Sequence, residues 1–188
     1  EVKKDSVNAD YKKVTKDAVI KQGLFTTFLS KKENNLYFEI PDSAFSHTYL
    51  LTNRIAETSN THDYVAGQMA TNPLMIRFSK DGQKVYMHLV QSSNMVDQND
   101  PITSAFNKNF ADPVLKGFKI VARNQGNVVI DVTSFFGGNE KCISPIKQES
   151  PLAKLFGGGN SLKGTFAADA SNILSVKTFP NCHLLPLR

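Results

Sequence analysis

The sequence predicts an α+β fold in which antiparallel β-hairpins form a mainly β core, with a few short helices beside it. Three observations lead to this class. Runs of alternating apolar and polar residues occur in pairs around short turns rich in Gly, Asn or Asp. Helix signals are confined to short stretches that begin with a capping residue. No apolar run approaches the roughly 20 residues that a membrane-spanning helix needs.

The N-terminal segment predicts a short helix. In residues 6–22, Asp10 is the candidate N-cap, and the apolar residues after it are loosely spaced for one helix face. These apolar residues are Tyr11, Val14 and Ala18. The lysines and β-branched residues of the segment make the helix marginal on its own.

Residues 24–41 predict a hairpin, because two alternating runs flank a polar turn at 32–35. With this four-residue loop, Leu29 faces Phe38. A two-residue loop would set Phe38 against Lys31 instead, so the apolar match favours the longer loop.

The following segments predict a turn, a strand and a domain boundary. Residues 42–45 form a turn or a single helical turn, and residues 48–56 alternate as a strand. Residues 57–73 are polar and turn-rich, which is typical of a connection. We therefore expect a small N-terminal β-hairpin domain over residues 1–60 and a larger α+β domain over residues 70–188.

The best-specified hairpin lies in residues 74–90, LMIRFSKDGQKVYMHLV. Asp81-Gly82 suits a two-residue type I′ loop, which needs positive φ at both positions. The register set by this loop pairs apolar residues on one face, namely Phe78 with Val85, Ile76 with Met87 and Leu74 with Leu89. We expect this face to be buried and residues 80–83 to be exposed in the turn.

Two further elements follow in the second half of the chain. Asp100 and Pro101 begin a helix that runs to about residue 110, with Ile102, Ala105, Phe106 and Phe110 on one face. Residues 118–136 form another hairpin, which turns at 125–127. The apolar density of this hairpin suggests a central position under a helix.

The C-terminal part predicts a short helix and two short strands. Ser150-Pro151 begins the helix, which Gly157 ends. Residues 157–160 are glycine-rich, but they lack the spacing of a phosphate-binding loop and follow a helix, so we interpret them as a helix stop. In residues 164–179 two strands flank a turn at Ser171-Asn172.

The charge balance does not indicate nucleic-acid binding. The chain has a formal net charge of +5, but 18 of its 22 basic residues are Lys and only four are Arg, the type favoured for bidentate phosphate and base contacts. No aromatic residues alternate with a basic stripe. We interpret the lysine-rich start of the chain as a solvated surface.

No catalytic, cofactor-binding or metal-binding residue is predicted. We expect Cys142 and Cys182 to be free thiols. The histidines, His47, His62, His88 and His183, have no zinc-type spacing and are interpreted as surface or sheet-face residues. Asp131 lies among apolar residues in a strand, where a carboxylate satisfied by a partner is favoured over a functional one. No HExxH or Gly-x-Ser-x-Gly motif occurs.

Several stretches of the chain carry a family resemblance. These are GLFTTFLSKKENNLYFEIPDSAFSHTYLLTNRIAET, IRFSKDGQKVYMHL, FNKNFADPVLKGFKIVA and VVIDVTSFF. Together they resemble the N-terminal region of large exported bacterial zinc-dependent metalloproteases. In that family two leading domains of unknown function precede a metzincin-like catalytic domain with HExxH. The resemblance covers about residues 10–180 and includes no catalytic signature.

The resemblance implies a non-catalytic N-terminal scaffold, a substrate-positioning module or a pro-region. It places zinc and its ligands in a downstream catalytic domain, which would be the partner of this chain, so we expect no enzymatic activity from the chain alone. It also implies an exported, periplasmic or envelope-associated protein. The alternative is a free-standing envelope module that binds a peptide or a glycan.

Both ends of the chain carry expectations. The polar start lacks an initiator Met and an apolar signal region, which is typical of a processed or truncated N-terminus. Residues 182–188 depart from the family pattern and suggest a truncated gene, a frameshift or a deliberately shortened chain. We interpret Cys182 and His183 as accidents of this tail and not as metal ligands.

Overall fold

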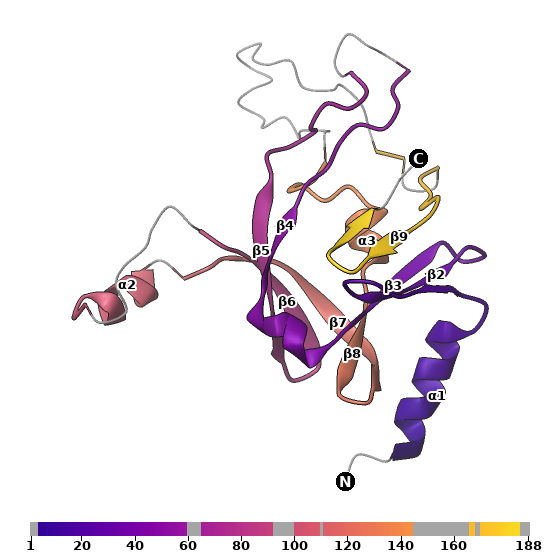
Figure 1. Ribbon diagram of the computed structural model, residues 1–188, viewed down its shortest axis with the longest axis horizontal. Helices are drawn as coiled ribbons and strands as arrows, with labels where there is room; N and C mark the ends of the chain where they lie inside the picture. Colours follow the sequence, from indigo (N-terminus) through magenta and orange to yellow (C-terminus); the bar gives the residue numbers. More distant parts are fainter. Residues whose placement is uncertain are drawn as a thin grey trace.

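The computed structural model describes residues 4–59, 65–91, 100–109, 111–144, 166–167 and 170–184 (Figure 1). Within these residues eight strands form one antiparallel sheet, and two further strands form a small separate sheet. The strands of the large sheet are β1 (Val19–Lys21), β2 (Thr26–Ser30), β3 (Asn35–Ile40), β4 (Thr48–Leu51), β5 (Leu74–Asp81), β6 (Lys84–Leu89), β7 (Val114–Asn124) and β8 (Asn127–Asp131). The other elements are α1 (Lys4–Thr15), η1 (Asp42–Ser46), α2 (Thr103–Asn109), α3 (Thr133–Phe136), β9 (Lys177–Phe179) and β10 (Cys182–Leu184).

The order of the strands in the large sheet is β1-β2-β3-β8-β7-β6-β5-β4. The first four strands of the chain therefore occupy both edges, and β5 to β8 fill the middle. The prediction of a mainly β core of antiparallel hairpins with a few short helices is confirmed, and the helical share of the predicted α+β class is small. Strands from residues 1–60 and from residues 70–188 both contribute to one sheet, and the division of the chain into two domains stays a prediction.

The sheet curls, so its inner face encloses the main core. Phe25, which precedes β2 near one end of the sheet, contacts Tyr49 and Phe78 at the other end, with ring centroids 5.4 and 6.1 Å apart. Such contacts require the two ends to approach each other. The fully buried Phe135 of α3 packs on Phe118 and helps to close the inner face. Buried residues of this core include Leu36, Phe38, Ile40, Ile76, Val85, Met87, Val128, Ile130, Ile173 and Val176.

The outer face is covered by α1 over β2, β3, β7 and β8. Tyr11 and Val14 of the helix pack on a second buried cluster, which consists of Phe28, Ala122 and Val129. The ring of Tyr11 meets that of Phe28 edge-on at 5.8 Å. Tyr11 and Val14 of the predicted apolar side are thus confirmed, whereas Ala18 lies beyond the end of α1. The predicted helix over residues 6–22 is wrong at its end, because residues 19–21 form β1. The predicted N-cap is wrong, because Asp10 lies inside α1.

The central hairpin has the predicted faces but a different register. Phe78 lies opposite Met87 and not opposite Val85, and the loop is Gly82-Gln83. Only Gly82 has a positive φ in this loop (+56°), which is the pattern of a type II′ turn with glycine first. The pairing is therefore shifted by two residues. An even shift keeps every side chain on its face, so the predicted burial of Ile76, Phe78, Val85 and Met87 is confirmed.

The first hairpin shows the same kind of shift. Its loop has four residues as predicted, but they are 31–34, and Leu29 pairs with Leu36. Asn34 takes the left-handed conformation (φ +54°) that closes the loop. The side chain of Asn34 also bonds the backbone of Ser171 and Ile173, at 3.2 and 2.9 Å. This long-range anchor fixes the loop position and was not visible in the local pattern.

The third hairpin is central as predicted, but its second strand is shorter. Gln125 and Gly126 form its turn, both with positive φ, and β8 ends at Asp131. The carboxylate Oδ1 of Asp131 accepts a hydrogen bond from the N–H of Thr133 at 2.9 Å, which turns the chain into α3. The predicted strand at 132–136 is therefore wrong.

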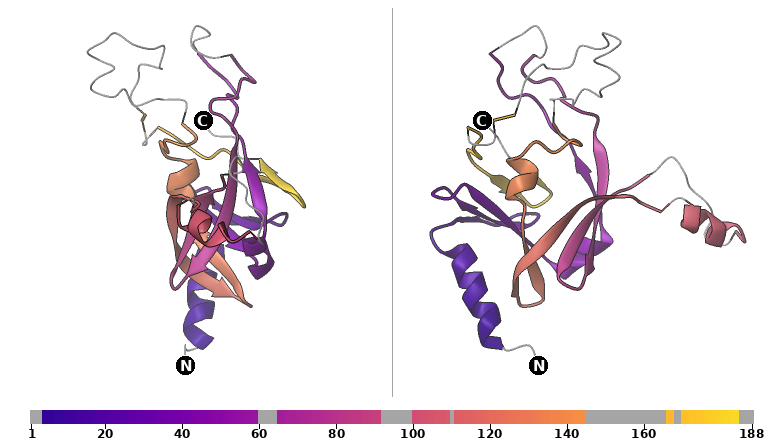
Figure 2. Two further views of the ribbon diagram at one scale, coloured as in Figure 1. Left: turned by 90° about the vertical axis from the view of Figure 1, so that its left-hand side faces the viewer. Right: turned by 180° about the vertical axis from the view of Figure 1, so that it is seen from behind.

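The helix near residue 100 is confirmed, although it starts two residues later than predicted. Asp100 Oδ1 accepts a hydrogen bond from the N–H of Ile102 at 2.9 Å before α2 begins. Ile102 and Ala105, from the predicted apolar face, are exposed. The helix stands away from the sheet in Figure 1 and in the right-hand view of Figure 2.

The remaining predictions concern the strand after η1 and the C-terminal part. The predicted strand at 48–56 is shorter, because β4 ends at Leu51 and only a bridge between Arg54 and Met69 extends it. The terminal hairpin pairs β9 with β10 and turns at Pro180-Asn181. Of the two strands predicted in 164–179, the first lies mostly outside the described residues, and β9 lies within the second. The helix predicted at 151–156 and the glycine run at 157–160 lie outside the described residues.

Candidate functional site

Among the described residues no helix covers the outer face over β4, β5 and β6, beyond the reach of α1. Strand alternation points Leu50 and Met75 outward there, opposite each other in the ladder. Val114 follows across β6, opposite His88. The exposed fractions of Leu50, Met75 and Val114 are 68%, 39% and 54%. We call these three residues the outer patch.

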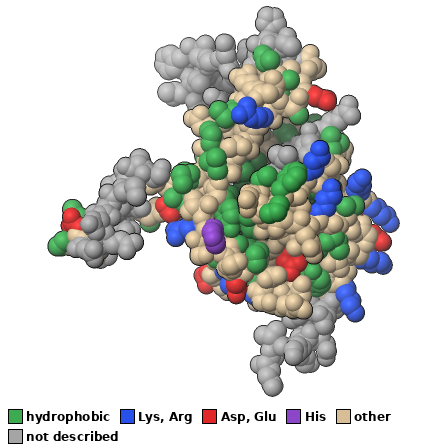
Figure 3. All heavy atoms as spheres, viewed as in Figure 1, with side chains coloured by type: hydrophobic (Ala, Val, Ile, Leu, Met, Phe, Trp, Pro, Cys, Tyr) green, Lys and Arg blue, Asp and Glu red, His purple; other side chains and the backbone are tan. Residues whose placement is uncertain are grey.

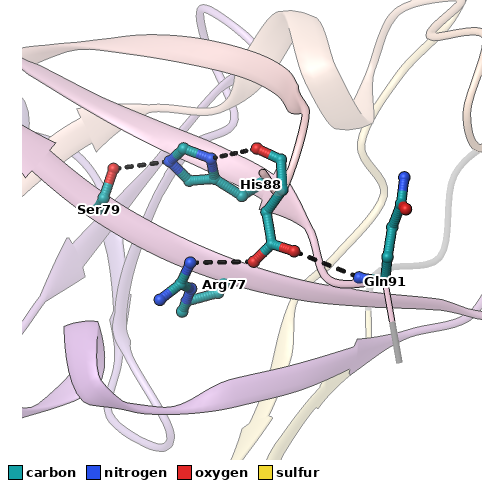
Figure 4. A network of polar contacts seen from close by, with 5 residues as sticks. Arg77, Ser79, His88 and Gln91 are labelled. Atoms are coloured by element: carbon teal, nitrogen blue, oxygen red, sulfur yellow. Dashed lines mark hydrogen bonds and ion pairs between the residues drawn. The ribbon is translucent and has the colours of Figure 1, made fainter. Parts of the chain in front are cut away.

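A polar network lies beside the outer patch (Figure 4). Arg77 donates to Asp112 Oδ2 at 2.9 Å, and the backbone N–H of Gln91 donates to Asp112 Oδ1 at 3.4 Å. Ser79 Oγ lies 2.7 Å from Nε2 of His88, and Nδ1 of His88 lies 3.3 Å from the carbonyl oxygen of Asp112. Because Asp112 directly precedes β7, the network ties together the outer sides of β5, β6 and β7.

The network orients the ring of His88. A carbonyl oxygen only accepts, so the Nδ1–H of His88 donates to Asp112, and the Ser79 hydroxyl bonds Nε2 on the other side of the ring. A serine bonded to an imidazole is also an arrangement used in nucleophilic catalysis. The cation of the network, Arg77, is already held by the carboxylate of Asp112. We interpret the network as a tie that keeps the open half of the sheet rigid.

A buried carboxylate anchors α1 on the covered half. Glu39 of β3 is 5% exposed, and its oxygens accept hydrogen bonds from Tyr11 Oη, Asn124 Nδ2 and Asn127 Nδ2, each at 3.0 Å. Burial and the bond to Glu39 raise the pKa of Tyr11 to about 12. Glu39 was not predicted from the sequence pattern. The residues that could have indicated it are Asn124 and Asn127, which pair with each other beside the turn at 125–126 and both donate to Glu39.

A small groove lies at the opposite edge, beside β1. Its volume is about 90 Å³, and it is lined by Val19, Lys21, Leu29, Lys31, Ser175 and Val176. Lys21 Nζ donates to the carbonyl of Val176 at 2.8 Å, which ties the groove walls together. Basic side chains gather on this side of the molecule, over α1, β2 and β3 (Figure 3). Small-molecule sites usually measure 300–1,000 Å³, so the groove is small for such a role.

The histidines and cysteines named from the sequence do not form one site among the described residues. His47 is exposed and bonds Ser43 within its own turn, and His88 belongs to the polar network. The side chains of His62 and His183 lie outside the described residues. Cys142 and Cys182 are free thiols, and burial together with the nearby Glu140 raises the pKa of Cys142. Within the described part of the chain, no three His, Cys, Asp or Glu residues gather as metal ligands.

Asp131 has the partner that the sequence analysis favoured. Its carboxylate accepts the N–H of Thr133, and the Thr133 hydroxyl in turn bonds β3, where it accepts from the N–H of Leu36 at 2.8 Å. The aspartate thereby joins the end of β8 to α3 and to β3. Its role in the fold accounts for its position.

The fold and these surfaces define a mainly β module with one covered and one open outer surface. Residues 67–183 match the family described as Domain of unknown function (DUF5117), and residues 9–58 match Domain of unknown function (DUF5118). The first match spans more than half of the chain, so the chain belongs to the DUF5117 family. Neither curated proteins nor solved structures gave a match. No helix in the described residues is long and apolar enough to cross a membrane.

Proposed function

We propose that the chain is a non-catalytic binding module that holds an extended polypeptide segment, as the substrate-positioning part of a larger, exported, zinc-metalloprotease-like polypeptide. The outer patch carries the binding part of this proposal. The resemblance of four stretches of the sequence to such metalloproteases supports the wider context. In that context the zinc site belongs to a downstream domain, and the chain itself supplies contact surface.

The outer patch has the composition of a contact surface. Leu50 and Met75 are cross-strand neighbours, and Val114 lies farther along the same face, beyond β6. Covering three such partly exposed side chains would contribute on the order of 2–4 kcal/mol to binding. This is a modest gain, which suits a module that releases what it holds.

The charges beside the outer patch favour a polypeptide over a nucleic acid. On the outer face Arg77 is paired with Asp112, and on the other face of β5 Lys80 is paired with Asp42 at 2.7 Å. These cations are neutralised within the chain, whereas phosphate binding draws on free cations. The alternative is a free-standing envelope module that binds a peptide or a glycan. One observation distinguishes the two: a downstream reading frame that encodes HExxH supports the leading proposal, and its absence supports the alternative.

The binding part can be tested with an unfolded protein as the probe. A reduced and carboxymethylated protein should change the fluorescence anisotropy of the labelled chain, and the double variant L50K/M75K should lose this response. Ile20→Lys is the matched control, because Ile20 is also an exposed apolar strand residue but lies in β1. The probe is acidic, so added lysines would strengthen a purely electrostatic attraction. Equal binding by both variants, or no binding at all, would overturn the proposal.

The catalytic part of the proposal has its own measurement. The purified chain should show no zinc-dependent peptidase activity, and a chelator should leave its melting temperature unchanged. One equivalent of tightly bound zinc, with peptide cleavage lost on chelation, would place catalysis within this chain.

A further inference from the structure

Within the described part of the chain no strand pairs with the outer edge of β4, and the direction of its backbone groups follows from the ladder. The N–H of Val90 donates to the carbonyl of Met75 at 2.8 Å, so the backbone groups of Met75 face β6. In an antiparallel strand the N–H and C=O of one residue point to the same side, and opposite residues alternate between bonded and non-bonded pairs. Leu50 is opposite Met75, so the N–H and C=O of Leu50 point away from β5.

The same alternation applies to Thr48, two residues earlier on the strand. Thr48 and Leu50 therefore present two donors and two acceptors along the open edge. β4 is the last strand of the sheet order, and no strand of the described residues lies beyond it. These four groups are the hydrogen-bonding half of a strand pair.

β4 is also held rigidly from its inner side. The ring of Tyr49 packs against Phe25 and Phe78, and its hydroxyl donates to the carbonyl of Ala44 at 3.0 Å. Leu51 packs against the same core. The edge is thus fixed before a partner arrives, which lowers the entropy lost on binding.

The other edge of the sheet is protected, and the contrast favours β4. β1 has three residues, including Lys21, whose ammonium group bonds Val176. β9 lies against the chain just after β1, because Leu24 N–H donates to Phe179 and Thr178 donates to Gln22, each at 2.8 Å. Short length, lysine and a covering segment are the usual protections of an edge strand. β4, with the sequence TYLL, has no charge and no proline.

We propose that β4 takes up an extended polypeptide segment by strand addition, with apolar side chains of the segment lying beside Leu50 on the outer patch. This deepens the proposed function and rests on it. A second copy of the chain is the competing occupant. A four-residue edge buries far less than the roughly 1,200–2,000 Å² of a stable interface between folded proteins. A flexible segment needs no such area, because main-chain hydrogen bonds supply much of its affinity.

The test uses a fluorescein-labelled heptapeptide, Lys-Val-Thr-Val-Thr-Val-Lys, and a version N-methylated at its three valines. N-methylation removes the donors that would pair with β4 and leaves the valine side chains. Anisotropy titration should show at least about tenfold weaker binding of the N-methylated peptide, the loss expected from two or three hydrogen bonds. Equal binding of both peptides, or binding of neither, would overturn strand addition.

A matched pair of variants places the peptide on β4. Leu50→Pro removes an outward N–H and spares the ladder with β5, as proline is tolerated on edge strands in this orientation; it should weaken binding about tenfold. Leu50→Val keeps the N–H and an apolar side chain and should bind within about twofold. Should Leu50→Pro fail to fold, the two peptides still decide the outcome.

The outcomes separate this inference from the proposed function. Binding of the unfolded protein that depends on the outer patch, together with equal binding of both heptapeptides, would overturn strand addition and leave the proposed function standing. Loss of patch dependence would overturn both. Sedimentation of the chain without peptide gives the last outcome: a dimer that Leu50→Pro abolishes would assign the edge to a second copy and overturn the proposal.

Discussion

The outer face of the sheet has two halves, of which one is covered by a helix and the other is exposed. Over β2, β3, β7 and β8, α1 buries Phe28, Ala122 and Val129 and is anchored by the bond from Tyr11 to Glu39. Over β4, β5 and β6, Leu50 and Met75 meet solvent, and the charges are paired among themselves. The same alternation of side chains produces both halves. The presence of a helix decides whether an outward apolar residue serves stability or remains available for contact.

The largest expected effect concerns the N-terminal segment of the chain, whose strands pair with strands from the rest of the chain. The connection between β4 and β5 joins segments whose strands pair with each other, and β3 pairs with β8. Limited proteolysis between residues 58 and 63 should therefore cut the chain without releasing a stable N-terminal fragment. Size-exclusion chromatography of the nicked protein checks this. Recovery of a separately folded piece of about 60 residues would show two independent domains.

A direct comparison of the halves uses alanine at one position in each. Phe28→Ala should lower the free energy of unfolding by about 3–5 kcal/mol, because it leaves a cavity under α1. Leu50→Ala should change it by less than about 0.5 kcal/mol, because the side chain is already mostly exposed. Urea denaturation measures both. Similar losses for the two variants would contradict the division of the outer face.

Removing the Glu39 anchor of α1 should lower the free energy of unfolding by less than removing Phe28 does, but by a measurable amount. Glu39→Ala leaves the donors of Tyr11, Asn124 and Asn127 without their acceptor, so it should cost about 2–3 kcal/mol. Tyr11→Phe removes a single hydrogen bond and should cost about 1 kcal/mol. A cost for Glu39→Ala no larger than that for Tyr11→Phe would mean that the two asparagines find other partners.

The pH dependence sharpens the comparison further. The folded-state pKa of Tyr11, about 12, lies above the ordinary value, so folding favours the protonated phenol. This contribution is fully present below about pH 10 and is lost as the pH rises through about 12. Burial raises the pKa of Tyr37 and Tyr49 in the same direction, so the comparison is with Tyr11→Phe. The stability difference between the two proteins should shrink between pH 9 and pH 12 in urea titrations.

The smallest effect belongs to the open half. Arg77→Ala breaks an exposed ion pair with Asp112 and should change the free energy of unfolding by no more than about 1 kcal/mol. Thermal unfolding at low and high salt measures this. A loss above about 2 kcal/mol would show that the polar network carries more of the fold than an exposed pair does.

The sequence predicted faces better than it predicted partners. In the central hairpin, alternation identified Ile76 and Phe78 as core residues, although the register was two residues off. The turn type follows from the positive φ of Gly82 alone. A register shift of two residues leaves the alternation of faces unchanged, so the hydrophobic pattern does not reveal it. The same limit applied to the first hairpin, where the loop position depends on Asn34 and its distant contacts with Ser171 and Ile173.

The surfaces were less predictable, for a similar reason. Glu39 lies at an outward position of β3, where a glutamate normally meets water, and its burial depends on where α1 packs. Leu50 lies in a strand whose place at the sheet edge follows from the order of all eight strands. Local patterns carry neither fact, because both arise from pairings between distant parts of the chain.

The pairing of β3 with β8 has a consequence for the order of events during synthesis. Residues 37–40 pair with residues 128–131, about 90 positions later in the chain. A ribosome adds roughly 5–20 residues per second, so β3 leaves the exit tunnel several seconds before its neighbour exists. During that interval its apolar residues, Leu36, Phe38 and Ile40, have only β2 beside them. The nascent chain is thus most exposed to misassociation just before residue 131 emerges, and a chaperone that shields the first hairpin would act in that window.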